Sequence, residues 1–189
     1  MRVLLVDNYD SFTYNLAQLL DESKLCSFVI KKNDKIDFQN INNYDKILLS
    51  PGAGIPSEAG QMMQVIKEFY DKKPIFGVCL GMQAIAEFFG GSLLNLNTVY
   101  HGKKIEINVD NSDPIFAGFN KNIDVGLYHS WAVQKENLPA ILKITAISKQ
   151  NIIMAISHKY YDVKGVQFHP ESYMTKDGKA ILTNWLKAI

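Results

Sequence analysis

The sequence predicts an α/β fold: a single domain over residues 1–189 with a mostly parallel central sheet, helices on both faces of that sheet, and additional antiparallel strands in the second half. Short, continuous apolar runs alternate with helix-length amphipathic segments in the first half, as expected for strands buried on both faces. Five strand-like segments follow in the second half before a closing helix. A chain of 189 residues, 47% of them hydrophobic, is long enough for one such core.

Strands and helices alternate through the first half. Continuous apolar runs predict strands at residues 3–6, 26–30, 46–49 and 74–78. Helical spacing of apolar residues predicts a helix running through Leu20 and further helices at residues 58–70 and 83–89. Asp10 or Ser11 is expected to cap the first helix. The segment from Ser50 to Gly54 is expected to break all regular structure.

The second half has a different pattern. Strands are predicted at residues 103–109, 124–128, 141–147, 152–158 and 165–168. A closing helix is predicted at residues 175–189, with Ile181, Leu182 and Trp185 on its apolar side. No linker, repeat or low-complexity segment interrupts the chain, so one domain is the simplest organisation.

Composition and charge exclude several classes of function. Twenty Lys and Arg oppose nineteen Asp and Glu, and the basic residues are scattered, which argues against nucleic acid or an anionic membrane as the main partner. No apolar run is long enough to span a bilayer, and the N-terminus lacks a signal-peptide pattern. Two cysteines do not make a disulfide framework. We therefore expect a cytoplasmic protein in which a free thiol persists.

The segment Gly77-Val78-Cys79-Leu80-Gly81 predicts a catalytic nucleophile. It follows an apolar strand and opens a helix, so it is the cysteine counterpart of the G-x-S-x-G nucleophile elbow. The N-terminus of the helix would favour a thiolate on Cys79. A free cysteine is more often a small core residue, and Cys26 is interpreted in that way. The strand, the two glycines and the helix together favour the nucleophile for Cys79.

A candidate base and its orienting group follow in His169-Pro170-Glu171. Pro170 favours an extended His169, and residues two apart in an extended segment point to the same side. His169 can then take and return a proton while Glu171 fixes its imidazole. A surface His beside a surface Glu is the ordinary alternative, and His129 is the other candidate base.

The Gly-rich segment Ser50-Pro51-Gly52-Ala53-Gly54 is a candidate oxyanion loop. Attack on a carboxamide creates an oxyanion that needs fixed hydrogen-bond donors. Backbone N–H groups of this loop, together with the N–H of Leu80, would provide them. A plain turn is the better interpretation of such a loop unless Cys79 is the nucleophile.

Six motifs in this order carry a family resemblance: Asp7-Asn8-Tyr9-Asp10-Ser11-Phe12-Thr13-Tyr14-Asn15-Leu16, Leu49-Ser50-Pro51-Gly52, Ser57-Glu58-Ala59-Gly60, Gly77-Val78-Cys79-Leu80-Gly81, Tyr128-His129-Ser130 and Phe168-His169-Pro170-Glu171-Ser172. With them the chain resembles the class I (triad) glutamine amidotransferases along nearly its whole length. Within that family it is most similar to the small subunits of anthranilate synthase and aminodeoxychorismate synthase.

The resemblance implies a glutaminase that forms a γ-glutamyl thioester on Cys79, with His169 and Glu171 completing the triad. It implies that L-glutamine is held by Gly52, Ala53, Gly54, Leu80, Gln83, Ser130 and Trp131, and that His129 is a structural neighbour of the pocket. It also implies a chorismate-binding synthase subunit as the partner that uses the ammonia, with neither a cofactor nor a metal.

The chain departs from the subgroup at Ala53, where proline is usual, at Met82, where histidine is frequent, and at Trp131, where leucine is frequent. None of these changes removes a triad group. Alternatives are a γ-glutamyl hydrolase or the glutaminase of another synthetase, a flavodoxin-like nucleotide binder, and an inactive regulator. The loop from Asn8 to Ser11 lacks the glycines of a dinucleotide site, and the complete triad argues against the regulator. The sequence does not distinguish anthranilate from aminodeoxychorismate as the product.

Overall fold

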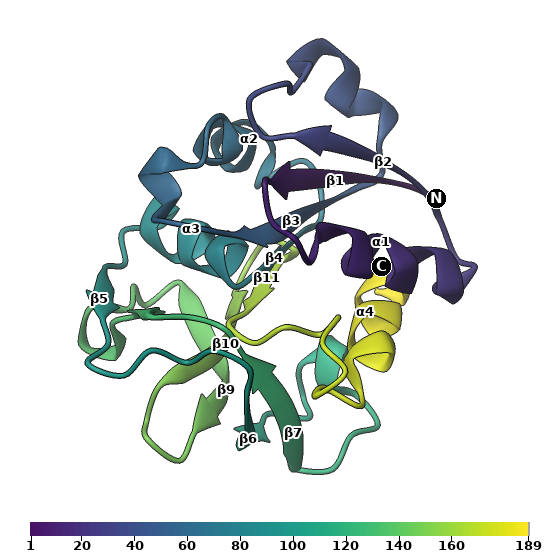
Figure 1. Ribbon diagram of the computed structural model, residues 1–189. Helices are drawn as coiled ribbons and strands as arrows, with labels where there is room; N and C mark the ends of the chain where they lie inside the picture. Colours follow the sequence, from purple (N-terminus) through teal and green to yellow (C-terminus); the bar gives the residue numbers. More distant parts are fainter. Residues whose placement is uncertain (189) are drawn as a thin grey trace.

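A mixed β-sheet forms the centre of the molecule in the computed structural model, which describes residues 1–188 (Figure 1). Its strands are β1 (Arg2–Asn8), β2 (Ser27–Lys32), β3 (Lys46–Gly52), β4 (Ile75–Val78), β6 (Lys103–Val109), β7 (Asn122–Leu127), β9 (Leu142–Ser148), β10 (Ile153–His158) and β11 (Val163–Val166). Within the described residues they lie in the order β2-β1-β3-β4-β11-β10-β9-β6-β7.

The sheet has a parallel half and an antiparallel half. Strand β1 pairs in parallel with β2 and β3, and β4 pairs in parallel with β3 and β11. From β11 outward, the pairs with β10, β9, β6 and β7 are all antiparallel. The predicted fold class is therefore confirmed, including the change of pattern in the second half of the chain.

Helices cover both faces of the parallel half, as predicted (Figure 1). They are α1 (Thr13–Ser23), α2 (Met62–Phe69), α3 (Leu80–Phe88) and α4 (Gly178–Lys187). On one face Leu5 of β1 shares a core with Leu16 of α1 and Trp185 of α4. On the other face Leu4 of β1 shares a core with Ile66 of α2, and α3 contacts β3, β4 and β11. Alternate residues of β1 thus face opposite layers.

Three helix starts differ from the sequence-based predictions. Helix α1 begins after Phe12, which makes no side-chain cap, while the Asp10 carboxylate accepts a hydrogen bond from the Phe12 N–H at 2.8 Å. Helix α2 begins four residues later than predicted, because a 3₁₀ turn (Pro56–Glu58) and the left-handed Gly60 (φ 52°) precede it. Helix α3 begins at Leu80, three residues earlier than predicted. The other 3₁₀ turns are Phe38–Asn43, Pro114–Phe116 and Lys135–Asn137.

The predicted closing helix also begins late, at Gly178, and Ile189 lies outside the described residues. Thr175 is instead buried, and its hydroxyl donates to the His169 carbonyl at 2.7 Å and accepts from the Gly126 N–H at 2.9 Å. Because this hydroxyl satisfies two backbone groups, Thr175 anchors the loop before α4.

Strand β3 extends to Gly52, so regular structure breaks only at Ala53 and not at Ser50 as predicted.

A two-stranded ribbon of β5 (Leu93–Asn95) and β8 (Trp131–Val133) was not predicted. It ties the chain after α3 to the segment that follows β7. The carboxyl ends of β1, β3, β4 and β11 meet at one edge of the sheet, where open α/β folds place their ligands. In residues 1–188 the structure has no helix that is both long and apolar enough to cross a membrane.

Candidate active site

The elbow between β4 and α3 presents Cys79 in a strained conformation. Cys79 has φ 52° and ψ −102°, a positive φ that non-glycine residues rarely adopt. A Cβ on Gly77 would lie 2.4 Å from the Gly81 carbonyl carbon, and one on Gly81 would lie 2.8 Å from the Leu49 Cβ. The Cys79 N–H donates to the Val166 carbonyl at 2.8 Å. Gly77 is therefore required for β4 to approach α3 at this turn, and Gly81 for α3 to approach β3.

His169 and Glu171 face each other, as the sequence predicts. The imidazole Nδ1 lies 2.6 Å from Glu171 Oε1, and both side chains are buried. The backbone N–H of His169 donates to the Gly126 carbonyl at 3.0 Å. The rings of Phe12 and Tyr128 pack edge-on against the imidazole, with centroid distances of 5.3 and 4.9 Å. The ring therefore has little freedom to turn.

The other imidazole nitrogen of His169, Nε2, is buried and has no hydrogen-bond partner among the described residues, although the Cys79 side chain lies close enough to raise the pKa of the ring. Burial alone would lower the pKa of His169, but the interactions with Cys79 and Glu171 outweigh it and raise the pKa to about 10. A proton passing from the thiol to this imidazole would thus be stabilised by Glu171. The three groups form the constellation of a nucleophile, a base and an orienting carboxylate.

His129 is less suited to the role of base. Its Nδ1 lies 2.8 Å from the Trp131 carbonyl, which can only accept, so this nitrogen carries the hydrogen. Burial lowers the pKa of His129 to about 4, and the ring is therefore neutral near pH 7. Its hydrogen-bond partner is a carbonyl where His169 has a carboxylate. No comparable group would stabilise an imidazolium at this position.

A pocket of about 190 Å³ opens above Cys79. It brings together most of the residues that the sequence proposes for substrate binding, and its lining is Gly52, Ala53, Gly54, Cys79, Gln83, Tyr128, His129, Ser130 and Trp131. Leu80 lies below the oxyanion loop, and its Cδ2 would be 2.6 Å from a Cβ on Gly52. His169 and Glu171 are buried and do not line the pocket.

Sequence reasoning missed one polar residue of this site. Gln167 is completely buried, and its Nε2 donates to Cys79 Sγ at 3.5 Å. Its Oε1 accepts from Gln83 Nε2 at 3.1 Å. The available signal was a glutamine between the apolar Val166 and Phe168, directly before His169. The predicted strand at residues 165–168 hid it, because β11 ends at Val166 and Gln167 already belongs to the site.

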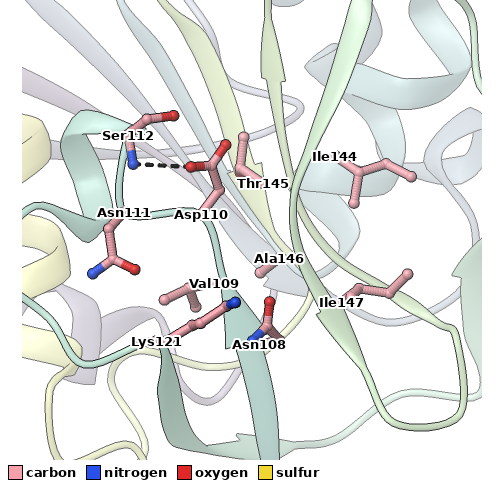
Figure 2. A pocket seen from close by; sticks show the side chains of 10 residues that line it. All are labelled: Asn108, Val109, Asp110, Asn111, Ser112, Lys121, Ile144, Thr145, Ala146 and Ile147. Atoms are coloured by element: carbon pink, nitrogen blue, oxygen red, sulfur yellow. Dashed lines mark hydrogen bonds between the residues drawn. The ribbon is translucent and has the colours of Figure 1, made fainter.

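A roomier hollow of about 450 Å³ is lined by residues of the paired strands β6 and β9 and of the segment that follows β6 (Figure 2), and it shares no lining residue with the Cys79 pocket. Its titratable groups are Asp110 and Lys121. Asp110 accepts from the Ser112 N–H at 2.9 Å and pairs with Lys143 at 2.6 Å, and these contacts hold its pKa well below the usual range. The only carboxylate in the lining is thus held in an ion pair, and the lining has no thiol or imidazole, so we place the chemistry in the smaller pocket. Among residues 1–188, no group of three or more His, Cys, Asp or Glu is placed to hold a metal.

Known proteins of one family are similar to this chain over nearly its whole length. The family model for class-I glutamine amidotransferases matches residues 4–189. Aminodeoxychorismate/anthranilate synthase component 2 of Bacillus subtilis is 44% identical over 187 residues, covering 98% of this chain and 95% of the relative. Aminodeoxychorismate synthase component 2 of Escherichia coli is 41% identical over 186 residues, covering 97% of this chain and 98% of the relative. A glutamine amidotransferase structure from Thermotoga maritima shares the fold, with a TM-score of 0.79 at 14% identity over 100% of this chain and 99% of that one. The chain belongs to the class I glutamine amidotransferases.

Proposed function

We propose that this enzyme hydrolyses L-glutamine through a γ-glutamyl thioester on Cys79 and supplies the ammonia to a chorismate-binding synthase subunit. The observation that carries the proposal is the position of Cys79 at the wall of a small polar pocket, with the buried His169–Glu171 pair behind it. A strained nucleophile beside a fixed base is the arrangement that covalent acyl transfer requires.

In the proposed reaction the His169 imidazole already holds the Cys79 proton, in keeping with its raised pKa, and the sulfur attacks the side-chain carboxamide carbon of glutamine. The C–N bond breaks as His169 returns the proton to the leaving nitrogen, which departs as NH₃. A water molecule, deprotonated by the same imidazole, then attacks the thioester and releases glutamate. Glu171, 2.6 Å from Nδ1, stabilises the imidazolium that forms in both halves of the reaction.

The oxyanion of each tetrahedral intermediate is assigned to two backbone elements. Leu80 is the first residue of α3, so its N–H has no partner within the helix. The Gly52–Gly54 segment lines the same pocket as Cys79, and Gly54 (φ 75°) adopts a left-handed conformation there. Loss of one oxyanion donor typically costs about a hundredfold or more in rate, so the position of this loop is a sufficient control point.

The proposed partner follows from the relatives and from the chemistry of ammonia. Both relatives compared above are named component 2 of a synthase, and the chain covers nearly their whole length. Only NH₃ has a lone pair to attack with, and water near neutral pH protonates it, which favours transfer across a docked interface. Anthranilate and aminodeoxychorismate are both compatible products, because the chorismate chemistry belongs to the partner.

The test reconstitutes the enzyme with a chorismate-binding synthase subunit and supplies either glutamine or ammonium as the nitrogen source. Wild type is expected to use both, whereas Cys79→Ser should use only ammonium, because a hydroxyl is far less acidic than a thiol. Wild-type product formation from glutamine by Cys79→Ser would contradict the assigned nucleophile.

The same reconstituted system tests the role of the partner. We expect the free chain to be a weak glutaminase that the synthase subunit activates by stabilising the competent oxyanion loop. Glutaminase kcat/KM is measured with and without the subunit and chorismate. An unchanged value, with complex formation shown by size-exclusion chromatography, would contradict activation.

A further inference from the structure

A chain of hydrogen bonds connects the pocket wall to the Cys79 sulfur. The Trp131 carbonyl lies 2.8 Å from His129 Nδ1 and 2.9 Å from Gln83 Nε2. Gln83 Nε2 lies 3.1 Å from Gln167 Oε1, and Gln167 Nε2 lies 3.5 Å from Cys79 Sγ. Three side chains and one backbone carbonyl therefore lead to the reacting sulfur, through hydrogen bonds that involve neither the His169 nor the Glu171 side chain.

Chemistry alone fixes the direction of this chain. The Trp131 carbonyl can only accept, so the terminal atom of Gln83 that faces it must be the NH₂ group. That NH₂ group also faces Gln167, so the Gln167 atom nearest to it must be the oxygen. The remaining atom of the Gln167 amide, which faces Cys79, is therefore a donor. The assignment requires no choice between alternative amide orientations.

We propose that Gln167 is a further catalytic residue, whose amide N–H stabilises the Cys79 thiolate, and that Gln83 acts as a positioning residue that holds the amide in this orientation. The inference rests on the function proposed above. Gln167 is completely buried and Gln83 nearly so, and hydrogen bonds to charged groups are the strong ones, particularly where water is excluded. A glutamine amide cannot lose its proton near neutral pH, so it remains a donor while His169 gains and loses one.

The alternative is a purely structural role, in which Gln167 accepts the hydrogen bond of the Gln83 amide and fills space in the core. The two interpretations differ in what happens to the thiol when the amide is removed. A structural residue changes stability and leaves the thiol–thiolate balance unchanged. A catalytic donor shifts that balance toward the thiol, because the hydrogen bond favours the charged form.

The experiment measures the rate of iodoacetamide alkylation of Cys79 against pH, in a Cys26→Ser background so that one thiol reacts. Gln167→Met keeps a similar volume and removes both hydrogen-bonding groups. We expect the midpoint of the alkylation profile to rise by about one pH unit and the rate at neutral pH to fall by about tenfold, with the plateau at high pH unchanged. Gln134→Met is the matched control, because the Gln134 amide bonds Ser92 and Asn137, distant from the sulfur.

A second arm tests the orienting role of Gln83. Gln83→Met should shift the profile in the same direction, and the double variant should shift no further than Gln167→Met alone, because both changes act through one hydrogen bond. Additive shifts would contradict the relay. If circular dichroism shows that Gln167→Met does not fold, Gln167→Glu replaces it, since the carboxylate keeps the acceptor for Gln83 and faces the thiolate with a negative charge. The midpoint of the Gln167→Glu alkylation profile should rise above that of wild type by more than the value of about one pH unit expected for Gln167→Met.

A wild-type alkylation profile in Gln167→Met, or in a folded Gln167→Glu, would overturn the inference while leaving the proposed function intact. A wild-type Cys79 that reacts no faster than an ordinary thiol at neutral pH, together with no glutamine-dependent synthesis, would contradict the proposed function and this inference with it. The two failures are therefore distinguishable by the wild-type measurement.

Discussion

Replacing Glu171 by glutamine tests the electrostatic part of the triad with the smallest change in shape. Glu171 Oε1 lies 2.6 Å from His169 Nδ1, and Glu171 Oε2 has no hydrogen-bond partner within the described residues. In Glu171→Gln the amide oxygen is therefore free to take the place of Oε1 and to keep Nδ1 as the protonated nitrogen. The fold and the tautomer of His169 should persist, and only the negative charge is removed.

The magnitude follows from the hydrogen bond that loses its charge. Hydrogen bonds to charged groups contribute about 1.5–3 kcal/mol, and neutral ones about 1 kcal/mol, so the imidazolium should lose roughly 1–2 kcal/mol. This corresponds to a fall of about one unit in the pKa of His169. It also corresponds to about a tenfold loss in glutaminase kcat, in the thioester-hydrolysis step, where the neutral imidazole takes a proton from water. Loss of the nucleophile itself should cost much more.

The sign of the pH dependence follows from the direction of the His169 shift. Its folded-state pKa is raised to about 10, from an ordinary value of 6.5. Protonation of His169 therefore stabilises the fold fully below about pH 6.5, and this contribution is lost as the pH rises through about 10. The wild type should lose more stability than Glu171→Gln over that interval.

Steady-state glutaminase assays with the synthase subunit, an NMR titration of His169, and thermal unfolding across that pH interval check these expectations. Wild type and Cys79→Ser are the reference proteins. A well-folded Glu171→Gln as inactive as Cys79→Ser would refute the reasoning, because Glu171 would then do more than orient and stabilise His169. An unchanged His169 titration would refute the electrostatic argument.

Two further predictions concern the base and the elbow. His169→Ala should lose about two to four powers of ten in glutaminase kcat. His129→Ala should lose much less, because His129 is held neutral beside a carbonyl. Equal losses in two folded variants would leave the base unassigned. Gly77→Ala should unfold at a lower temperature and lose glutaminase activity, because the new Cβ would lie 2.4 Å from the Gly81 backbone. Overpacking of this kind costs about 1–3 kcal/mol of stability. A wild-type melting temperature would show that the turn relaxes without strain.

The parts of the site that depend on local geometry could be predicted from the sequence. The steric role of Gly77 follows from the tight turn that a strand-to-helix elbow requires, and the structure confirms that role. Gly81 was predicted for the same reason, but a Cβ on it would meet Leu49 of β3, so it serves the approach of α3 to a neighbouring strand. The pairing of His169 with Glu171 was predicted from alternation in an extended segment. Their hydrogen bond confirms the pairing, but the predicted reason was wrong, because residues 169–172 form a turn in which the Ser172 N–H donates to the His169 carbonyl at 3.1 Å.

The parts that depend on contacts distant in sequence could not be predicted in this way. Gln167 gains its position from Gln83 and from the Trp131 carbonyl, which come from other elements. Strand β8 exists through its pairing with β5, a segment too short to give its own periodic signal. The late start of α2 depends on the left-handed Gly60, where a Cβ would lie 2.7 Å from Asn33 Oδ1. Tertiary contacts decided each of these features.

The most direct test of the account is to identify the atom of the enzyme that carries the glutamyl group. Wild type with the synthase subunit and chorismate is mixed with glutamine, quenched in acid during turnover and analysed by intact and peptide mass spectrometry. The account predicts a mass gain equal to glutamine minus ammonia, located on Cys79, sensitive to hydroxylamine and absent from Cys79→Ser. Turnover without any adduct on Cys79, or with an adduct on another residue, would contradict it.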